Sequence, residues 1–177
     1  MKDTLFRGAI PIFYAHWEGF VKHSSIAKMH YLVAKGFKYT ELQPCYHVYA
    51  ILEAYEGNIP SKKFEAWVDI TSGKIDYTKS IGASSITQID TKSNLNYEVL
   101  REVAIKSGVD YKPFQLKEKW IDEKLVALRN KICHGEKAPV NEAEFEELYT
   151  ETTTLISTYK DELLNSIHRQ TYLLNIA

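Results

Sequence analysis

The chain has 177 residues, of which 45% are hydrophobic and 25% are charged. This length is typical of one domain, and the composition is that of an average folded protein, which excludes the disordered and fibrous classes. No segment reaches the ~18 uncharged apolar residues of a membrane helix, and the N-terminus lacks a signal-peptide core. The two cysteines have no Cys-x-x-Cys spacing, which argues against a disulfide scaffold or a zinc ribbon. We therefore expect one cytoplasmic domain over residues 1–177.

The charges nearly cancel but are unevenly distributed. The formal net charge is −1, whereas residues 1–63 and residues 101–137 each carry +3 and residues 138–177 carry −5. This distribution argues against a protein that coats nucleic acid over its whole surface. It leaves open a local basic groove formed by the two positive segments, because phosphate binding depends on where the charge lies.

Apolar side chains at three- and four-residue steps predict a first helix over residues 4–35. Pro11 interrupts it, so the helix either kinks there or starts again with the proline in its first turn. A second, shorter helix is expected over residues 45–55. Residues 57–94 mix turn residues with short β-branched runs, and we interpret them as an irregular insertion. It has a short helix or strand near its start and room for one small hairpin.

The second half of the chain is more regular. A third helix is expected over residues 96–107, and a fourth over residues 115–134, where apolar residues step by four, three and four before Gly135. Asn141, with a glutamate three residues later, predicts the start of a last helix reaching about residue 175, whose glutamates form a solvated face. No internal repeat is visible. The fold class is therefore an all-α, antiparallel helical bundle with an irregular insertion around residues 57–94.

The segment LVALRNKICHGE, residues 125–136, is the strongest candidate for a site. On a helix, Asn130 and His134 project about 40° apart, whereas Arg129 lies about 140° from His134. Arg129 and His134 would converge only if the helix loosens near Gly135, or if a second subunit supplies the partner. In the alternative, purely structural interpretation, Arg129 makes a surface ion pair and the helix dipole stabilises His134.

Other histidines are weaker candidates. His16, His23 and His30 are spaced by seven and share one face of the first helix, about 10.5 Å apart along its axis, which is too far to bind one metal ion. We interpret them as polar or interface residues, with His16 alone a candidate to face the motif. No cluster has metal-ligand spacing and no phosphate-binding glycine loop is present, so neither a metal nor a cofactor is expected.

Two further residues lie close to candidate positions. Glu18 either pairs with Arg129 and orients it or is an ordinary surface residue. Cys133 is adjacent to His134, but neighbouring helical side chains diverge by about 100°, so a thiolate–imidazole pair is disfavoured and a buried thiol is expected.

Three segments together resemble the HEPN superfamily, in particular a branch of small, single-domain HEPN-like ribonucleases. They are the Arg-x4-His motif RNKICH, the first-helix sequence GAIPIFYAHWEGFVK at residues 8–22, and the segment QIDTKSNLNYEVL at residues 88–100. With the fourth and last helices, the resemblance covers most of the chain. Such relatives have more sequence before the first helix, so the start of the bundle is expected to be trimmed here.

The resemblance implies a HEPN-like bundle that dimerises and acts as a metal-independent endoribonuclease, often in defence or toxin systems. By position, Arg129 and His134 would be the catalytic pair and Asn130 the accompanying polar residue. The implied partners are RNA, a second copy of the chain, and a cognate antitoxin or defence-system protein. Histidine suits proton transfer near neutrality, and arginine suits binding of phosphate oxygens. The alternative is a non-catalytic HEPN module that binds RNA, a nucleotide or a partner protein.

Overall fold

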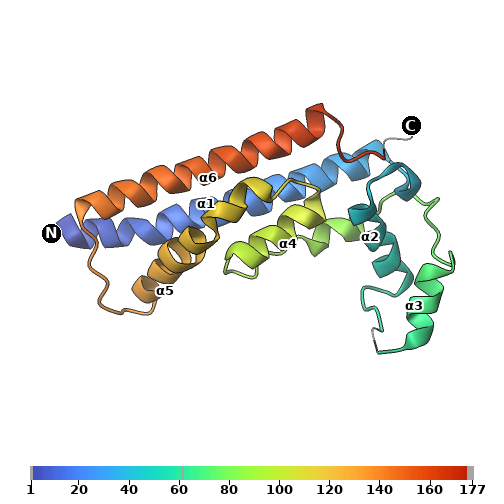
Figure 1. The fold of residues 1–177 in the computed structure, drawn as a ribbon, viewed down its shortest axis with the longest axis horizontal. Coiled ribbons are helices and arrows are strands. Elements are labelled where there is room, and N and C mark those ends of the chain that lie inside the picture. The colour runs from blue at the N-terminus through green and yellow to red at the C-terminus, as the bar shows by residue number, and fades with distance from the viewer. Residues whose placement is uncertain (1, 61, 175–177) are drawn as a thin grey trace.

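The computed structural model describes residues 2–60 and 62–174, and over these residues its regular elements are all helical. Figure 1 shows α1 and α6 lying side by side, with α4 and α5 on another side of α1 and with α2 and α3 projecting at one end. The longer elements are α1 (Lys2–Lys35), α2 (Pro44–Ala54), α3 (Phe64–Thr71), α4 (Tyr97–Ser107), α5 (Ala127–Cys133) and α6 (Glu142–His168). The short ones are η1 (Tyr39–Glu41), η2 (Ala83–Gln88), η3 (Lys112–Lys117) and η4 (Trp120–Val126). The expected all-α class is confirmed.

The helix directions differ from the simple antiparallel arrangement that we expected. α1, α4 and α6 run the same way, and α5 runs against them (Figure 1). The reason is the return segment, residues 81–95, which leads the chain back along α1 before α4 begins. Its start is fixed where the Ile81 N–H donates to the Phe37 carbonyl, and its end where the Leu95 N–H donates to the Tyr14 hydroxyl.

α1 continues through Pro11 without a break, so of the two alternatives, a kink or a restart, the restart is excluded. A proline inside a helix removes one backbone hydrogen bond and crowds the preceding turn. Burial offsets that cost here, because Ile10, Trp17 and Val21 on the inward face are fully buried. α1 therefore forms one long helix against which the other elements pack.

The insertion is helical rather than stranded. Its first part forms α3, and no hairpin appears in residues 57–60 and 62–94. The strand-like contacts are two isolated bridges, from Lys38 to Ser80 and from Leu42 to Leu173. The backbone of this region thus pairs at Ser80 with Lys38, a residue distant in sequence.

The expected continuous helix over residues 115–134 is divided. A 3-10 segment, η3, leads into the seven-residue π-helical segment η4, which becomes α-helical only at α5. The π-helical turn keeps Ile121, Leu125 and Val126 buried together. Leu128 and Ile132, the rest of the expected stripe, are half-buried. π-helical segments are rare and often accompany functional sites, and this one immediately precedes the motif.

α6 begins as expected but ends earlier. The Asn141 side chain accepts a hydrogen bond from the Glu144 N–H, which caps the helix start. The helix stops at His168, because the chain turns through Gln170 and buries Tyr172. Asn175 lies outside the described residues. Two of the glutamates expected on a solvated face instead hold η3 and η4: Glu147 accepts from Trp120 Nε1 at 3.0 Å, and Glu151 pairs with Lys117 at 2.7 Å.

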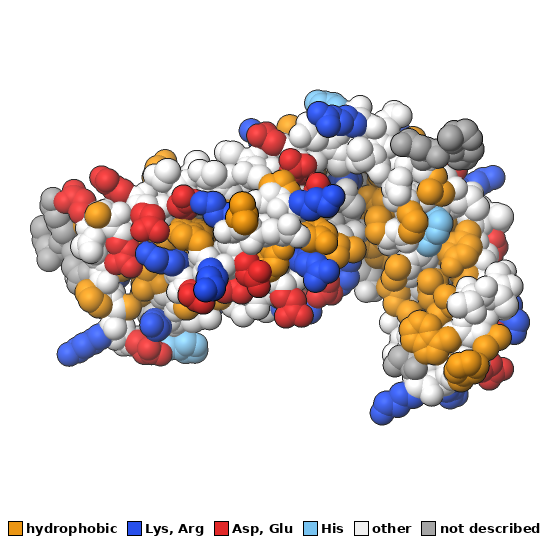
Figure 2. Space-filling model, viewed as in Figure 1, with side chains coloured by type: hydrophobic (Ala, Val, Ile, Leu, Met, Phe, Trp, Pro, Cys, Tyr) orange, Lys and Arg blue, Asp and Glu red, His pale blue; other side chains and the backbone are white. Residues whose placement is uncertain are grey.

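The surface shown in Figure 2 carries basic and acidic side chains interspersed over the bundle, without a continuous basic groove on that face. Apolar side chains gather instead over α2 and α3, where the exposed residues are Val48, Phe64, Trp67 and Val68. Among the described helices, none is both long and apolar enough to cross a membrane.

A buried lysine joins α1 to the ends of α4 and α6. Lys28 is only 2% exposed, and its Nζ donates hydrogen bonds to the Gly108 carbonyl at 2.9 Å and to the Ser166 hydroxyl at 2.6 Å. Both acceptors are uncharged. Burial lowers the pKa of Lys28 from 10.5 to about 8, because desolvation disfavours the ammonium form.

We predict that the lowered pKa of Lys28 makes the free energy of unfolding increase at alkaline pH. Because its pKa is lower in the folded protein, the unfolded chain binds the proton more tightly between pH 8 and 10.5. Its contribution to the free energy of unfolding should therefore rise with pH by up to about 1.4 kcal/mol per unit. In denaturant unfolding, wild type should gain stability relative to Lys28→Met across this window. A Lys119→Met control at an exposed position should show a constant difference, and parallel pH profiles for wild type and Lys28→Met would contradict the prediction.

Candidate functional site

Arg129 is the centre of the candidate site. It is the third residue of α5, and its side chain, 19% exposed, reaches across to α1. The guanidinium carbon lies 3.9 Å from the centroid of the Tyr14 ring, which places the cation over the aromatic face. Nη1 donates to Asn130 Oδ1 at 2.7 Å, and Nη2 donates to the Ser93 carbonyl at 2.9 Å. Arginine has five N–H donors, so these two bonds leave others for a ligand.

Of the two alternatives for Glu18, a pair with Arg129 or an ordinary surface role, the structure has the pair. Glu18 Oε2 lies 3.8 Å from Arg129 Nη2, and both side chains are less than one-fifth exposed. Glu18 Oε1 accepts a hydrogen bond from the Thr91 hydroxyl at 2.7 Å, which fixes the carboxylate. Tyr14, four residues before Glu18 on the same face of α1, is almost fully buried, and burial raises its pKa to about 12. Its ring is therefore a neutral platform for the guanidinium.

The end of the return segment closes the other side of Arg129. Lys92 and Ser93 have φ angles of 54° and 52°, in the left-handed region that residues other than glycine rarely adopt. This conformation turns the Ser93 carbonyl to Arg129. Lys92 is held by an ion pair with Glu102 at 2.8 Å. Two consecutive residues in a disfavoured conformation, one of them bonded to the motif arginine, mark this turn as a functional candidate.

Asn130 contacts Arg129, whereas His134 lies away from this network. The His134 N–H donates to the Asn130 carbonyl, and α5 is a regular α-helix from Ala127 to Cys133. The helix therefore does not loosen between Arg129 and His134, and their side chains stay about 140° apart. Arg129 points to α1, whereas His134 is exposed. Asn130 stands between them, because it accepts from Arg129 and lies about 40° from His134. Within one chain, the side chains of Arg129 and His134 therefore do not converge.

The other sequence candidates do not join the site. His16 lines a shallow hollow together with His23, Phe20 and Ile156, on a face of α1 away from Arg129. His16 and Glu18 are two residues apart, so on the helix they point about 160° away from each other. Cys133 was expected to be buried but is exposed, because it lies on the last turn of α5 on a side that no element covers.

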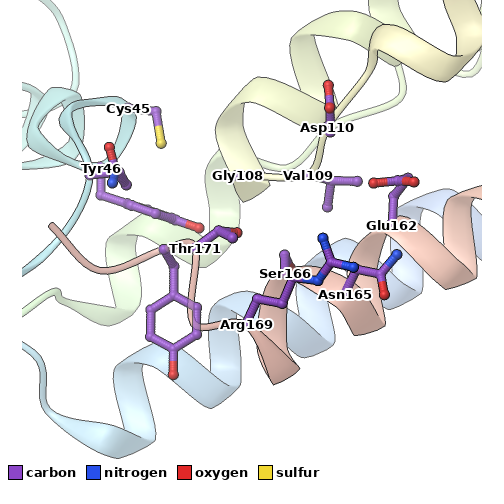
Figure 3. A pocket seen from close by; sticks show the side chains of 12 residues that line it. Cys45, Tyr46, Gly108, Val109, Asp110, Glu162, Asn165, Ser166, Arg169 and Thr171 are labelled. Carbon is purple, nitrogen blue, oxygen red and sulfur yellow. The ribbon is translucent and has the colours of Figure 1, made fainter. Parts of the chain in front are cut away.

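A large cavity lies elsewhere, where the ends of α4 and α6 meet the start of α2. Figure 3 shows its walls, which include Cys45, Asp110, Glu162, Ser166 and Arg169. Its volume is about 650 Å³, which is within the range of small-molecule pockets. Acidic and basic groups both line it, and no residue of the motif does. Within the described residues, no group of three or more His, Cys, Asp or Glu is placed to hold a metal ion.

Sequence reasoning missed Tyr14, Thr91 and Ser93, which hold Arg129 and its partner Glu18. The segments QIDTKSN and GAIPIFYAHWEGFVK had been noted for their resemblance, but nothing in their spacing shows that they meet. Thr91 lies 73 residues from Glu18, and Ser93 lies 36 residues from Arg129. Their proximity follows from the return segment, which no periodic pattern reveals.

A family model described as RiboL-PSP-HEPN matches residues 2–165 of the chain. The comparisons with curated proteins and with solved structures give no match. The matched residues include α1, the return segment, the motif and nearly all of α6, so the resemblance to the HEPN superfamily is confirmed. The chain belongs to the RiboL-PSP-HEPN family and carries a HEPN domain.

Proposed function

We propose that this protein is a metal-independent endoribonuclease in which Arg129, His134 and Asn130 form the reactive group. The observation that carries the proposal is the restraint of Arg129. Its guanidinium lies on Tyr14 and is bonded to Asn130 and Ser93, with His134 exposed at the end of the same helix. A held guanidinium with unused donors beside an exposed imidazole suits phosphate chemistry.

The proposed reaction uses the substrate's own 2′-hydroxyl as nucleophile. A general base removes its proton, the oxygen attacks the adjacent phosphorus, and Arg129 stabilises the charge on the non-bridging oxygens. A general acid then protonates the departing 5′-oxygen. The products are a 2′,3′-cyclic phosphate and a 5′-hydroxyl, and DNA is spared because it lacks the nucleophile.

The proposal includes a homodimer with a composite site. One histidine cannot easily serve as base and acid in the same turnover, and within one chain His134 and Arg129 project from different faces of a regular helix. A second copy related by a twofold axis supplies the complementary His134. Asn130, bonded to Arg129 and close to the face of His134, then orients the phosphate or the imidazole.

We extend the proposal to a toxin or defence setting with a cognate partner protein, as the HEPN resemblance implies. The surface best suited to such a partner is the exposed apolar region on α2 and α3, where Phe64 is 81% exposed. Large exposed apolar residues in a cluster commonly mark protein contacts.

A second candidate function is a non-catalytic module that binds RNA, a nucleotide or a protein. One observation favours it: two of the donors of Arg129 are already used inside the chain, by Asn130 and Ser93. An arginine that only joins α5 to α1 would have the same contacts. Enzymatic assays separate the two candidates.

We predict RNA cleavage that survives EDTA, with no cleavage of DNA or of RNA carrying a 2′-deoxy nucleotide at the scissile position. His134→Ala and Arg129→Ala should each lower the cleavage rate by on the order of a thousandfold or more, and Asn130→Ala by less. End-labelled RNA resolved on gels gives the rates and the product ends.

Arg129→Ala also removes a packing contact, so Arg129→Lys provides the matched control. Lysine keeps the positive charge but not the planar fork of donors. The Arg129→Lys variant should therefore fold, while its cleavage of RNA remains strongly impaired. Circular dichroism and thermal unfolding check the fold of each variant. Cleavage of the 2′-deoxy substrate, full activity of His134→Ala, or activity that returns only with Mg²⁺ or Mn²⁺ would refute the mechanism.

If the site is composite, cleavage activity should depend nonlinearly on the fraction of wild-type protein in a mixture of wild type and His134→Ala. When His134→Ala protein is exchanged into wild-type dimers at constant total concentration, activity should follow the square of the wild-type fraction, because mixed dimers have only one imidazole. Light scattering should show a dimer at micromolar concentration. A linear dependence on the wild-type fraction, or a stable monomer that retains activity, would exclude the two-histidine site.

We expect Glu18 to affect the cleavage rate through its ion pair with Arg129. Glu18→Gln keeps an acceptor for the Thr91 hydroxyl but loses the charge facing the guanidinium, so we expect a roughly tenfold fall in cleavage rate, and a larger fall for Glu18→Ala. Glu98→Gln, an exposed position on α4, is the control and should leave the rate unchanged. Equal rates for wild type and Glu18→Ala would show that Glu18 has only a surface role.

A further inference from the structure

The turn that follows His134 has a fixed geometry. Gly135 adopts a left-handed φ of 76°, its N–H donates to the Ile132 carbonyl, and the Glu136 N–H donates to the Lys131 carbonyl. These two bonds form a Schellman ending, with His134 as the residue that caps α5. The direction of the His134 side chain therefore depends on whether this turn holds.

One side chain from α1 reaches the same turn. Arg7 Nη2 donates a hydrogen bond to the Glu136 carbonyl at 3.0 Å, two residues beyond His134. Arg7 Nε is buried without a hydrogen-bond partner among the described residues. An arginine kept half-buried with one donor unsatisfied carries a free-energy cost, and the contact with Glu136 is what it gains.

Arg7 belongs to the row of α1 side chains that holds the motif. Residues 7, 14 and 18 are spaced by seven and four, so they lie within about 40° of one another on a helix and span about 16 Å. α5 runs antiparallel beside this row: Arg129 meets Tyr14 and Glu18, and Glu136 meets Arg7. Both ends of the motif are thus held by one face of one helix.

We infer that Arg7 is a positioning residue for His134, acting through the Glu136 carbonyl to hold the turn that aims the imidazole. The inference rests on the proposed function for its effect on catalysis, whereas its effect on the geometry of the turn does not. Arg7 does not touch the substrate in this assignment. Its contribution is to the rate of the chemical step and not to RNA binding.

The experiment compares Arg7→Ala, Arg7→Lys and wild type in the full chain without RNA. Nuclear magnetic resonance follows the His134 ring signals and the hydrogen exchange of the Glu136 amide. In Arg7→Ala we expect displaced His134 signals and exchange about tenfold faster or more, because without Arg7 the turn opens more often and with it the bond from the Glu136 N–H to the Lys131 carbonyl. Arg7→Lys, which can still donate to that carbonyl, should restore most of the wild-type values.

Two control variants separate positioning from general loss of stability. Asn141→Ala removes the cap of α6 at the far end of the same connection and leaves the Glu136 carbonyl bonded to Arg7. Arg101→Ala removes an exposed arginine that contacts Tyr111 on another part of the bundle. Neither should alter the His134 signals. If Asn141→Ala changes them as much as Arg7→Ala does, or if Arg7→Ala leaves them unchanged, the inference is overturned.

Cleavage assays give the second readout. Arg7→Ala should lower kcat by on the order of ten- to a hundredfold with KM nearly unchanged, because a displaced imidazole slows proton transfer without weakening RNA binding. A rise in KM alone would contradict positioning and indicate an RNA contact. If wild type cleaves no RNA while the magnetic resonance result holds, the proposed function fails and the structural assignment of Arg7 stands.

Discussion

The contact between the Arg129 guanidinium and the Tyr14 ring is the interaction on which the arrangement of the motif depends. It joins α5 to α1 at a point where a cation, an aromatic face and the Glu18 carboxylate meet with little exposure to solvent. A desolvated cation–π pair contributes up to about 2 kcal/mol, more than the exposed ion pairs elsewhere on this surface. The ring must also be held still, and the Leu95 N–H does this by donating to the Tyr14 hydroxyl.

The Tyr14 hydroxyl also ties the site to the end of the return segment, where two consecutive residues have left-handed φ angles. Lys92 and Ser93 stay in the left-handed region, at a cost of about 1–3 kcal/mol each, because side chains on three elements hold the turn around them. Thr91 binds Glu18 on α1, Lys92 binds Glu102 on α4, and the Ser93 carbonyl binds Arg129 on α5. Packing of the three helices therefore stabilises the turn, and the turn in return orients the arginine. The two arrangements require each other.

Periodicity predicted the elements that the core requires, and failed where tertiary contacts override it. The starts of α4 and α6 follow from the caps Asn96 and Asn141, which act within four residues. The end of α6 does not, because Tyr172 turns back to pack against the end of α1 and the segment after it. The π-helical segment η4 was equally unpredictable, since its apolar residues also fit an α-helical stripe.

The candidate site shows the same division. Arg129, Asn130 and His134 could be identified because they lie close together in one helix, and Glu18 because a carboxylate is a natural ion-pair partner for an arginine. Tyr14 and Ser93 could not be identified, because they come near the motif only after the return segment has led the chain back along α1. The expected antiparallel arrangement of the helices failed for a related reason. Parallel helices need long connections, and the irregular insertion provides that connection before α4.

The regularity of α5 has a consequence for how such a site can work. A helix that held Arg129 and His134 on one face would direct both side chains either to α1 or to solvent, and the base of the proposed mechanism could not reach RNA if it were buried against α1. The observed separation of about 140° instead lets α1 hold the arginine while the histidine stays accessible. One residue of this short helix, Arg129, is thus held rigidly, and another, His134, is accessible to solvent. In the proposed mechanism, a twofold copy of the chain completes the site at the solvent-facing His134, because it provides an identical imidazole.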